Sequence, residues 1–208
     1  MKVVFTARRL KPGQYDGFRK AWEPERFPEG FQRALILRDT SDPDVVVAFG
    51  LFDVSDERAD QLKNDLQPSE QARHDAMAPY VAETLVSGLF DVVYTMQGSG
   101  EGAHTIVPLT ERYLKPGVID AYRATMTKFA ESMGGPPQGM VEMMAMTDTA
   151  DGEHLIQLGI LRTDDPGALS SQNRGGREQM LEAIAPYIES IGIDTTFEMV
   201  EELAPSHA

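Results

Sequence analysis

Hydrophobic and polar positions along this chain change period several times, and each period predicts an element. Residues 3–10 alternate, so they predict a strand with one apolar face. Tyr15, Phe18 and Trp22 then recur at helical spacing and predict a helix with one apolar stripe. The rest of the first half predicts strands at 31–38, 45–52 and 89–96. Between the last two strands it predicts a short helical piece from 57 and a longer helix from 68. The apolar face of the longer helix holds Met77, Val81 and Leu85.

The same plan returns in the second half, together with three short landmarks. Leu-Lys-Pro-Gly stands at 10–13 and 114–117, and Ala-Pro-Tyr stands at 78–80 and 185–187. Gly50 lies inside an apolar run, as does Gly159. The order is kept and the offsets differ little, so the chain contains an internal duplication. The predicted elements of the second half are strands at 105–114, 140–147, 154–161 and 195–203 and helices at 118–132 and near 176–190.

Each half therefore follows the order β-α-β-β-α-β, which is the split βαβ plan of ferredoxin-like folds. We predict an α+β protein with repeats at 1–97 and 104–208, joined by a flexible glycine-rich linker at 98–103. A sheet with both helices on one face leaves its other face apolar and uncovered. Two such repeats in one chain can cover each other, sheet against sheet.

Composition and charge narrow the classes of partner. The net charge is −14, and neither half offers the positive face that a phosphate backbone requires, so nucleic acid is not an expected partner. The chain has no cysteine, which excludes disulfides and thiolate chemistry and fits a reducing compartment. No apolar run approaches the length of a membrane span. We expect a cytoplasmic protein that does not bind membranes.

Three runs of sequence resemble a known family. The runs "RRLKPGQYDGFRKAWEP" and "PEGFQRALILRDTSDPDVVVAFGLFD", followed by "ARHDAMAPYV" before an apolar strand, are similar to the antibiotic-biosynthesis-monooxygenase-like proteins. Members of that family are small ferredoxin-like domains that pair into dimeric α+β barrels. The resemblance covers almost the whole first half and the second half more loosely. It implies a pseudo-dimer within one chain, and a further homodimer stays open.

The resemblance also implies a function, with alternatives. The superfamily includes cofactor-free quinol monooxygenases, haem-degrading enzymes and members with no established activity. The leading hypothesis is a cofactor-independent monooxygenase that acts on a small phenol or quinol, whose anion reduces oxygen directly, so no cofactor is expected. Its site needs an apolar cavity, a polar group for the proton and aromatic walls. The alternatives are a haem-binding barrel and a non-catalytic small-molecule-binding or structural barrel.

The first half supplies the candidate catalytic residues His74, Trp22 and Tyr80. Trp22 is the only tryptophan, and it would serve as a pocket wall or simply pack in the core. His74 titrates near neutrality and could serve as the base, although its charged helical turn also fits a solvated residue. Tyr80 has a counterpart in Tyr187, which favours a structural task for both hydroxyls.

Four further residues are candidates for substrate binding: Arg38, Arg73, Tyr187 and His154. Arg38 ends a strand beside Asp39, where it either forms an ion pair or holds an anionic substrate. Arg73 stands next to His74. His154 begins a strand of the second half, where a lone histidine is usually exposed or hydrogen-bonded.

The histidine pattern bears on metals and haem. His74, His104, His154 and His207 show no metal-ligand spacing, so no dedicated metal site is expected. A haem needs only one axial ligand, which His74 or His154 could provide, so haem binding stays an alternative.

Overall fold

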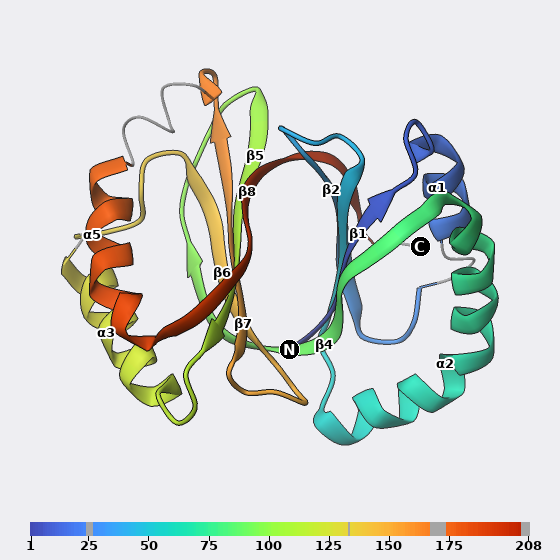
Figure 1. The fold of residues 1–208 in the computed structure, drawn as a ribbon, viewed down its shortest axis with the longest axis horizontal. Coiled ribbons are helices and arrows are strands. Elements are labelled where there is room, and N and C mark those ends of the chain that lie inside the picture. Colours follow the sequence, from blue (N-terminus) through green and yellow to red (C-terminus); the bar gives the residue numbers. More distant parts are fainter. Residues whose placement is uncertain (24–26, 133, 167–173, 205–208) are drawn as a thin grey trace. The chain divides into compact units, whose positions relative to one another are not determined.

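The computed structural model describes residues 1–23, 27–132, 134–166 and 174–204, without the side chains of 62–69 and 174–176. Its elements follow the predicted order twice (Figure 1). The first repeat contains β1 (Lys2–Leu10), α1 (Tyr15–Trp22), β2 (Phe31–Asp39), β3 (Val45–Phe52), α2 (Asp56–Met77) and β4 (Val81–Gln97). The second repeat contains β5 (His104–Leu114), α3 (Ile119–Ser132), β6 (Met140–Asp148), β7 (His154–Thr163), α5 (Arg174–Ile184) and β8 (Ile188–Leu203).

The strands of the described residues are hydrogen-bonded in the order β1-β3-β2-β8-β5-β7-β6-β4, which is that of a closed barrel. Within each repeat the first and third strands pair antiparallel, as β1 does with β3 and β5 with β7. The predicted fold class, α+β with two ferredoxin-like repeats in a dimeric α+β barrel, is confirmed. No helix in the described part of the chain is long and apolar enough to cross a membrane.

The chain divides into two compact units that share two strands. The first unit comprises Met1–Asp91 and the chain from Met199 onward, and the second comprises Val92–Glu198. The last residues of β8 therefore belong to the first unit, and the last residues of β4 belong to the second. The repeat boundaries at 97 and 104 stay a prediction.

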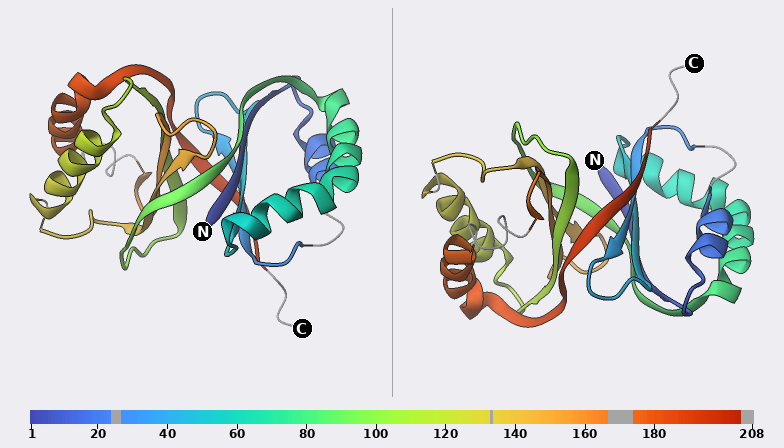
Figure 2. Two further views of the ribbon diagram at one scale, coloured as in Figure 1. Left: turned by 90° about the horizontal axis from the view of Figure 1, so that it is seen from below. Right: turned by 90° about the horizontal axis from the view of Figure 1, so that it is seen from above.

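In the first unit, the alternation of β1 places two kinds of side chain on opposite faces of the sheet. Val3, Phe5 and Ala7 are fully buried on one face. Arg8 and Leu10 lie on the face toward the helices, where Arg8 is in register with Val46 of β3. Figure 2 shows α1 and α2 packed side by side against this face. The candidate site lies in the side-chain layer between this face and the two helices.

The repeated landmarks contact each other within each half. The backbone N–H of Lys11 donates to Tyr80 O at 2.8 Å, and its Nζ donates to Pro79 O at 2.6 Å. In the second half, Lys115 N donates to Tyr187 O at 2.9 Å, and Lys115 Nζ donates to Pro186 O at 2.7 Å. The duplicated Lys-Pro-Gly and Ala-Pro-Tyr segments thus form one clamp, present twice, that ties the end of the first strand to the start of the last.

Two predicted element boundaries next to this clamp were wrong. The helix predicted to continue through Val81 and Leu85 ends at Met77, and a short 3₁₀ turn (Ala78–Tyr80) leads directly into β4 at Val81. In the second half, the 3₁₀ turn Ala185–Tyr187 leads into β8 at Ile188, not at 195. A proline within each turn lacks the N–H that a continuing helix needs. The two helical pieces expected from 57 and from 68 form the single helix α2.

The glycine-rich segment after β4 is anchored to its neighbours. Gly98 N donates to Val141 O at 2.9 Å, and Gly100 N donates to Met140 O at 2.7 Å. A Cβ on Gly98 would lie 2.2 Å from Met140 O, so the approach of the two backbones requires glycine there. The segment was expected to be flexible, but these two residues are held by main-chain hydrogen bonds.

Candidate functional site

The first unit contains a buried arginine on the helix-facing side of its sheet. Arg8 is only 5% exposed. Its Nη1 donates to Thr6 Oγ1 at 2.7 Å, and that hydroxyl donates to Ala48 O at 3.1 Å. The guanidinium carbon lies 6.0 Å from the centre of the Phe18 ring, within the range of a cation–π contact. Strand β1 therefore presents a fixed positive charge to helix α1.

The charge of Arg8 has no matching carboxylate at hydrogen-bond distance among the described side chains. Its only hydrogen bond within that set is to the neutral Thr6, so its Nε–Nη2 edge carries no described partner. Burial is the main cause that lowers the pKa of Arg8 to about 10; the nearby positive charge of Arg73 acts in the same direction, and Glu70 opposes the shift. The site is thus electropositive and poorly compensated, which suits an anion.

Arg73 adds a second guanidinium from α2. One of its terminal nitrogens donates to Glu70, three residues earlier on the same helix. Its Nε is buried and has no hydrogen-bond partner among the described residues. Its positive charge acts on Arg8, so Arg73 lies close to this layer. Its predicted role in substrate binding stays a prediction.

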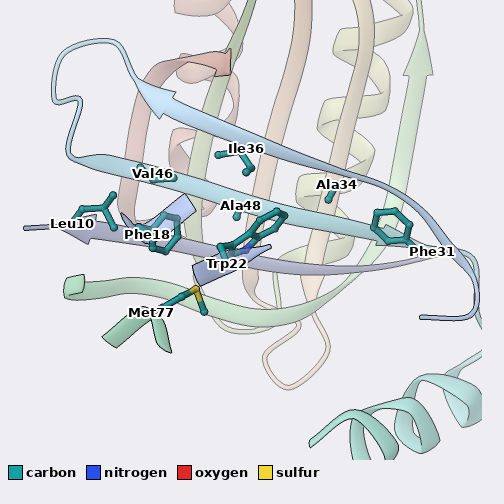
Figure 3. Packing of buried hydrophobic residues seen from close by; sticks show 9 residues of the cluster. All are labelled: Leu10, Phe18, Trp22, Phe31, Ala34, Ile36, Val46, Ala48 and Met77. Carbon is teal, nitrogen blue, oxygen red and sulfur yellow. The ribbon is translucent and has the colours of Figure 1, made fainter. Parts of the chain in front are cut away.

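Aromatic and apolar side chains fill the same layer. Trp22 is 8% exposed and packs in one cluster with Phe18 and Met77 against Val46 and Ala48 of β3 (Figure 3). The guanidinium of Arg19 lies 5.6 Å from the Trp22 ring. Arg19 is itself held by Glu201 of β8 through Nε and Nη2, both at 2.5 Å.

Tyr80 packs at the edge of this cluster against a glycine of α1. A Cβ on Gly17 would lie 2.4 Å from the Tyr80 ring, so the close approach of ring and helix depends on glycine. The fold therefore brings Trp22 and Tyr80 into one cluster. His74 does not join them, because its side chain is exposed on α2.

Arg38 makes its contacts with Pro43, in the turn between β2 and β3, and with the Tyr15 ring. Its Nε and Nη2 donate to Pro43 O at 3.2 and 3.0 Å, and its guanidinium lies 4.5 Å from the centre of the Tyr15 ring. Asp39 instead accepts from the backbone and hydroxyl of Ser41, both at 2.7 Å. The expected Arg38–Asp39 ion pair is absent from the described contacts, and Arg38 fixes the β2–β3 turn.

We compared the chain with known protein families, curated proteins and solved structures. No family model and no curated protein matches the sequence. An anthrone oxidase-like protein is similar in structure with a TM-score of 0.73 at 9% identity, over 99% of this chain and 94% of that one. A candidate monooxygenase from Fusobacterium nucleatum has a TM-score of 0.71 at 13% identity, over 99% and 94% of the two chains. A ferredoxin-fold protein from Listeria monocytogenes related to antibiotic biosynthesis monooxygenases has a TM-score of 0.54 at 8% identity, over 97% and 95%.

The chain has the fold of the antibiotic-biosynthesis-monooxygenase-like proteins. The predicted tandem pair is confirmed at the level of the fold, because these alignments run over nearly the whole chain. At this identity the likeness concerns the fold alone, and the chemistry must come from this chain's own residues.

The second unit of this fold holds His154 in a buried polar cluster. His154 is 7% exposed, with Nε2 2.9 Å from Glu111 Oε1 and Nδ1 3.4 Å from Asp148 Oδ2. Its ring stacks on Tyr113 with centroids 4.5 Å apart. Glu111 also accepts from Tyr113 Oη at 2.8 Å and from Ile193 N at 3.1 Å.

The two partners of this cluster shift each other's titration. Burial alone would lower the pKa of His154, but its hydrogen bonds to Glu111 and Asp148 outweigh burial and raise it. Burial would raise the pKa of Glu111, but its hydrogen bonds to His154, Tyr113 and Ile193 N outweigh burial and lower it. Each group therefore favours the charged form of the other.

This arrangement bears on haem. Both ring nitrogens of His154 face carboxylates, so neither is available as an axial ligand. His74 and His104 are exposed. The histidines that the structure describes thus do not fit a buried haem site, and His207 lies outside the described residues. No group of histidine and carboxylate side chains in the described chain is arranged to hold a metal ion.

Tyr187 is hydrogen-bonded and packed within the second unit, and its predicted role in substrate binding stays a prediction. Its hydroxyl accepts from Thr125 Oγ1 at 3.2 Å, and its ring meets Tyr122 edge to face with centroids 6.5 Å apart. It lies on the helix-facing side of its sheet, packed against the cluster of Leu114 and Leu155. His154 belongs instead to the polar cluster with Glu111 and Asp148. The structure therefore does not bring Tyr187 and His154 together.

A shallow groove of about 870 Å³ runs along the glycine-rich segment of the second unit, between 97–101, 136–140 and 162–165. None of the residues predicted from the sequence lines it.

The residues that sequence reasoning missed are Arg8 and its counterpart Arg112. Arg112 follows Arg8 by the same offset as the landmark, and it is 2% exposed. The signal was present, because an arginine stands two residues before Leu-Lys-Pro-Gly in both halves. Charged residues that alternate with apolar ones in a strand usually face solvent, so the pattern gave no indication of burial.

Proposed function

We propose that the first unit binds a small phenol or quinol as its anion and promotes its oxidation by oxygen without a cofactor. The observation that carries the proposal is the buried guanidinium of Arg8, whose Nε–Nη2 edge has no partner among the described side chains. It lies beside Phe18, which packs in one cluster with Trp22. The name of the anthrone oxidase-like protein, whose fold the chain shares, supports an aromatic substrate of this kind.

The physical reason is the stability of the phenolate. A free phenol has a pKa of about 10 and is almost entirely protonated near neutral pH. A buried guanidinium favours the charged form of a bound phenol and so lowers its pKa. The aromatic walls bind the ring and exclude water, which strengthens the electrostatic effect.

The overall reaction balances without another reductant. A phenol and O₂ give a quinone and water: one oxygen atom bonds to the ring carbon, the O–O bond breaks, and the ring C–H and phenol O–H hydrogens leave in water. The electrons that reduce oxygen come from the ring. His74 is exposed, so the proposal gives the phenol proton to solvent and not to His74.

The test combines a binding signal with oxygen uptake. Because Trp22 is the only tryptophan and lies in this cluster, its fluorescence reports ligand binding to the first unit. A panel of hydroquinone, 1-naphthol and anthrone should quench it and consume oxygen. Arg8→Gln should reduce uptake at least about tenfold, in line with the loss of a charge-assisted contact. The matched control is Arg9→Gln, which changes the neighbouring exposed arginine. Uptake that is equal in wild type and Arg8→Gln would refute the proposal.

A non-catalytic binding protein is the second candidate. The observation that favours it is the absence of a base in contact with Arg8 among the described side chains, since His74 is exposed. Quenching of Trp22 that depends on Arg8 but is not accompanied by oxygen uptake would select this candidate.

A further inference from the structure

We propose that the second unit holds a separate binding site for a small organic monocarboxylate, built around Arg112. This site lies in the other unit and uses other residues than the proposed oxidation site, so it does not depend on that function. It is carried by the buried surroundings of Arg112 and by the part of its guanidinium that has no partner among the described residues.

Arg112 lies on the helix-facing side of strand β5. It is in register with Leu155 of β7 and Ile191 of β8 and is 2% exposed. The layer between this face and helices α3 and α5 is apolar, with Leu114, Leu155 and Ile184 buried in it. A full positive charge is therefore held in a layer that offers little solvation.

The described partners of Arg112 are neutral, and half of its guanidinium has no partner within the described part of the chain. Nη1 donates to Gln157 Oε1 at 3.1 Å and lies 3.5 Å from Tyr122 Oη. Burial raises the pKa of Tyr122, although Arg112 opposes the shift, so the phenol supplies no negative charge. Nε is buried without a partner, and no described residue bonds to Nη2. The unpaired Nε–Nη2 edge is one that binds a carboxylate through two parallel hydrogen bonds.

The second unit differs from the first in three ways that define the ligand. Tyr122 stands where the first repeat has Phe18, Gln157 where it has Ala48, and Met180 where it has Arg73. One guanidinium remains in place of two, so the site matches a single negative charge. The apolar layer favours an organic anion over an inorganic one. Met126 and Met180 are only partly buried above it, and flexible methionines can move aside to admit a small ligand.

The first test introduces a carboxylate next to Arg112 by mutation. Gln157→Glu is isosteric and places a carboxylate oxygen next to Nη1 of Arg112. It should raise the melting temperature in the absence of ligand, because a buried cation gains a partner. It should also weaken the binding of added anion at least about tenfold. The control is Gln138→Glu, the same substitution at an exposed position in the same unit.

Sodium benzoate is the probe, and its binding is measured by titration calorimetry. Sodium gluconate keeps the ionic strength constant and serves as the control, because its large hydrophilic anion does not suit an apolar layer. The titration uses full-length protein carrying Arg8→Gln, so that the first unit does not contribute. One benzoate per chain should bind and raise the melting temperature, without a change in Trp22 fluorescence. Gln138→Glu should behave alike, and Gln157→Glu and Arg112→Leu should lose the response. No binding in the Arg8→Gln protein, or equal binding after Gln157→Glu, would overturn the proposal, whatever the oxygen-uptake assay shows.

Discussion

Replacing Arg8 by methionine should make the protein more stable while removing its proposed function. The pKa of Arg8 falls well below the ordinary value of an arginine, to about 10, chiefly through burial. That drop of about 2.5 corresponds to roughly 3 kcal/mol, which is the cost of holding the charged form in the folded protein. Methionine keeps the length and apolar stem of the side chain but carries no charge.

Two favourable contacts are lost with the guanidinium and reduce the gain. The hydrogen bond to Thr6 contributes about 1 kcal/mol, and the contact with Phe18 contributes about 0.5–1 kcal/mol. Thr6 keeps its bond to Ala48 O, so no buried polar atom is left without a partner. The net expectation is an increase of about 1 kcal/mol in the free energy of unfolding.

Urea denaturation followed by Trp22 fluorescence measures this change in the first unit. Arg9→Met is the control, because Arg9 is exposed and pairs with Asp42 at the surface, and it should change stability little. If Arg8→Met instead lowers the free energy of unfolding by more than about 1 kcal/mol, the charge of Arg8 is satisfied in the free protein. The argument for an anionic ligand would then fail.

Two further predictions concern the second unit and the helix packing. His154 has a raised pKa, so its pairing with Glu111 stabilises fully below the ordinary value of 6.5 and is lost as pH rises through the raised value. Glu111 has a lowered pKa, so its share is present above 4.5 and is lost as pH falls through the lowered value. The stability difference between wild type and His154→Gln should therefore be larger at about pH 5.5 than at about pH 9 by urea denaturation, and a constant difference would contradict the pairing. Gly17→Ala should lower the free energy of unfolding by about 1–3 kcal/mol, because its Cβ would overlap the Tyr80 ring. The control is Gly152→Ala, whose Cβ meets no atom within 4 Å and which should be close to neutral. Thermal unfolding of both variants decides this, and equal melting temperatures would refute the tight contact.

The fold could be predicted because its main signals are local and occur twice. The Lys-Pro-Gly landmark needs a left-handed glycine, and Gly13 and Gly117 have φ angles of +71° and +74°. The start of β4 could not be predicted in the same way, because Val81 and Leu85 also fit helical spacing. What decides it is the pairing of Val81 with Leu10, 71 residues earlier in the chain (81 − 10).

The candidate site was harder to predict because burial is a tertiary property. Arg8 is buried only when Phe18 of the following helix covers it, and no local pattern records that contact. His154 was expected to be exposed or hydrogen-bonded, and the sequence could not show which, because its partner Glu111 lies 43 residues away. His74 has the right chemistry for a base and the wrong exposure. Residue type and spacing thus identify which groups can do chemistry, while packing decides which of them are enclosed.

The exchange of strand ends has a consequence for how the gene can be divided. The first unit includes the chain from Met199 onward, where Glu201 holds Arg19 and Leu203 packs on the Trp22 cluster. A polypeptide that stops after the first repeat would lack this closing segment and leave Arg19 without Glu201. Each half supplies the final stretch of the other half's compact unit, so we expect that neither half folds as an independent protein.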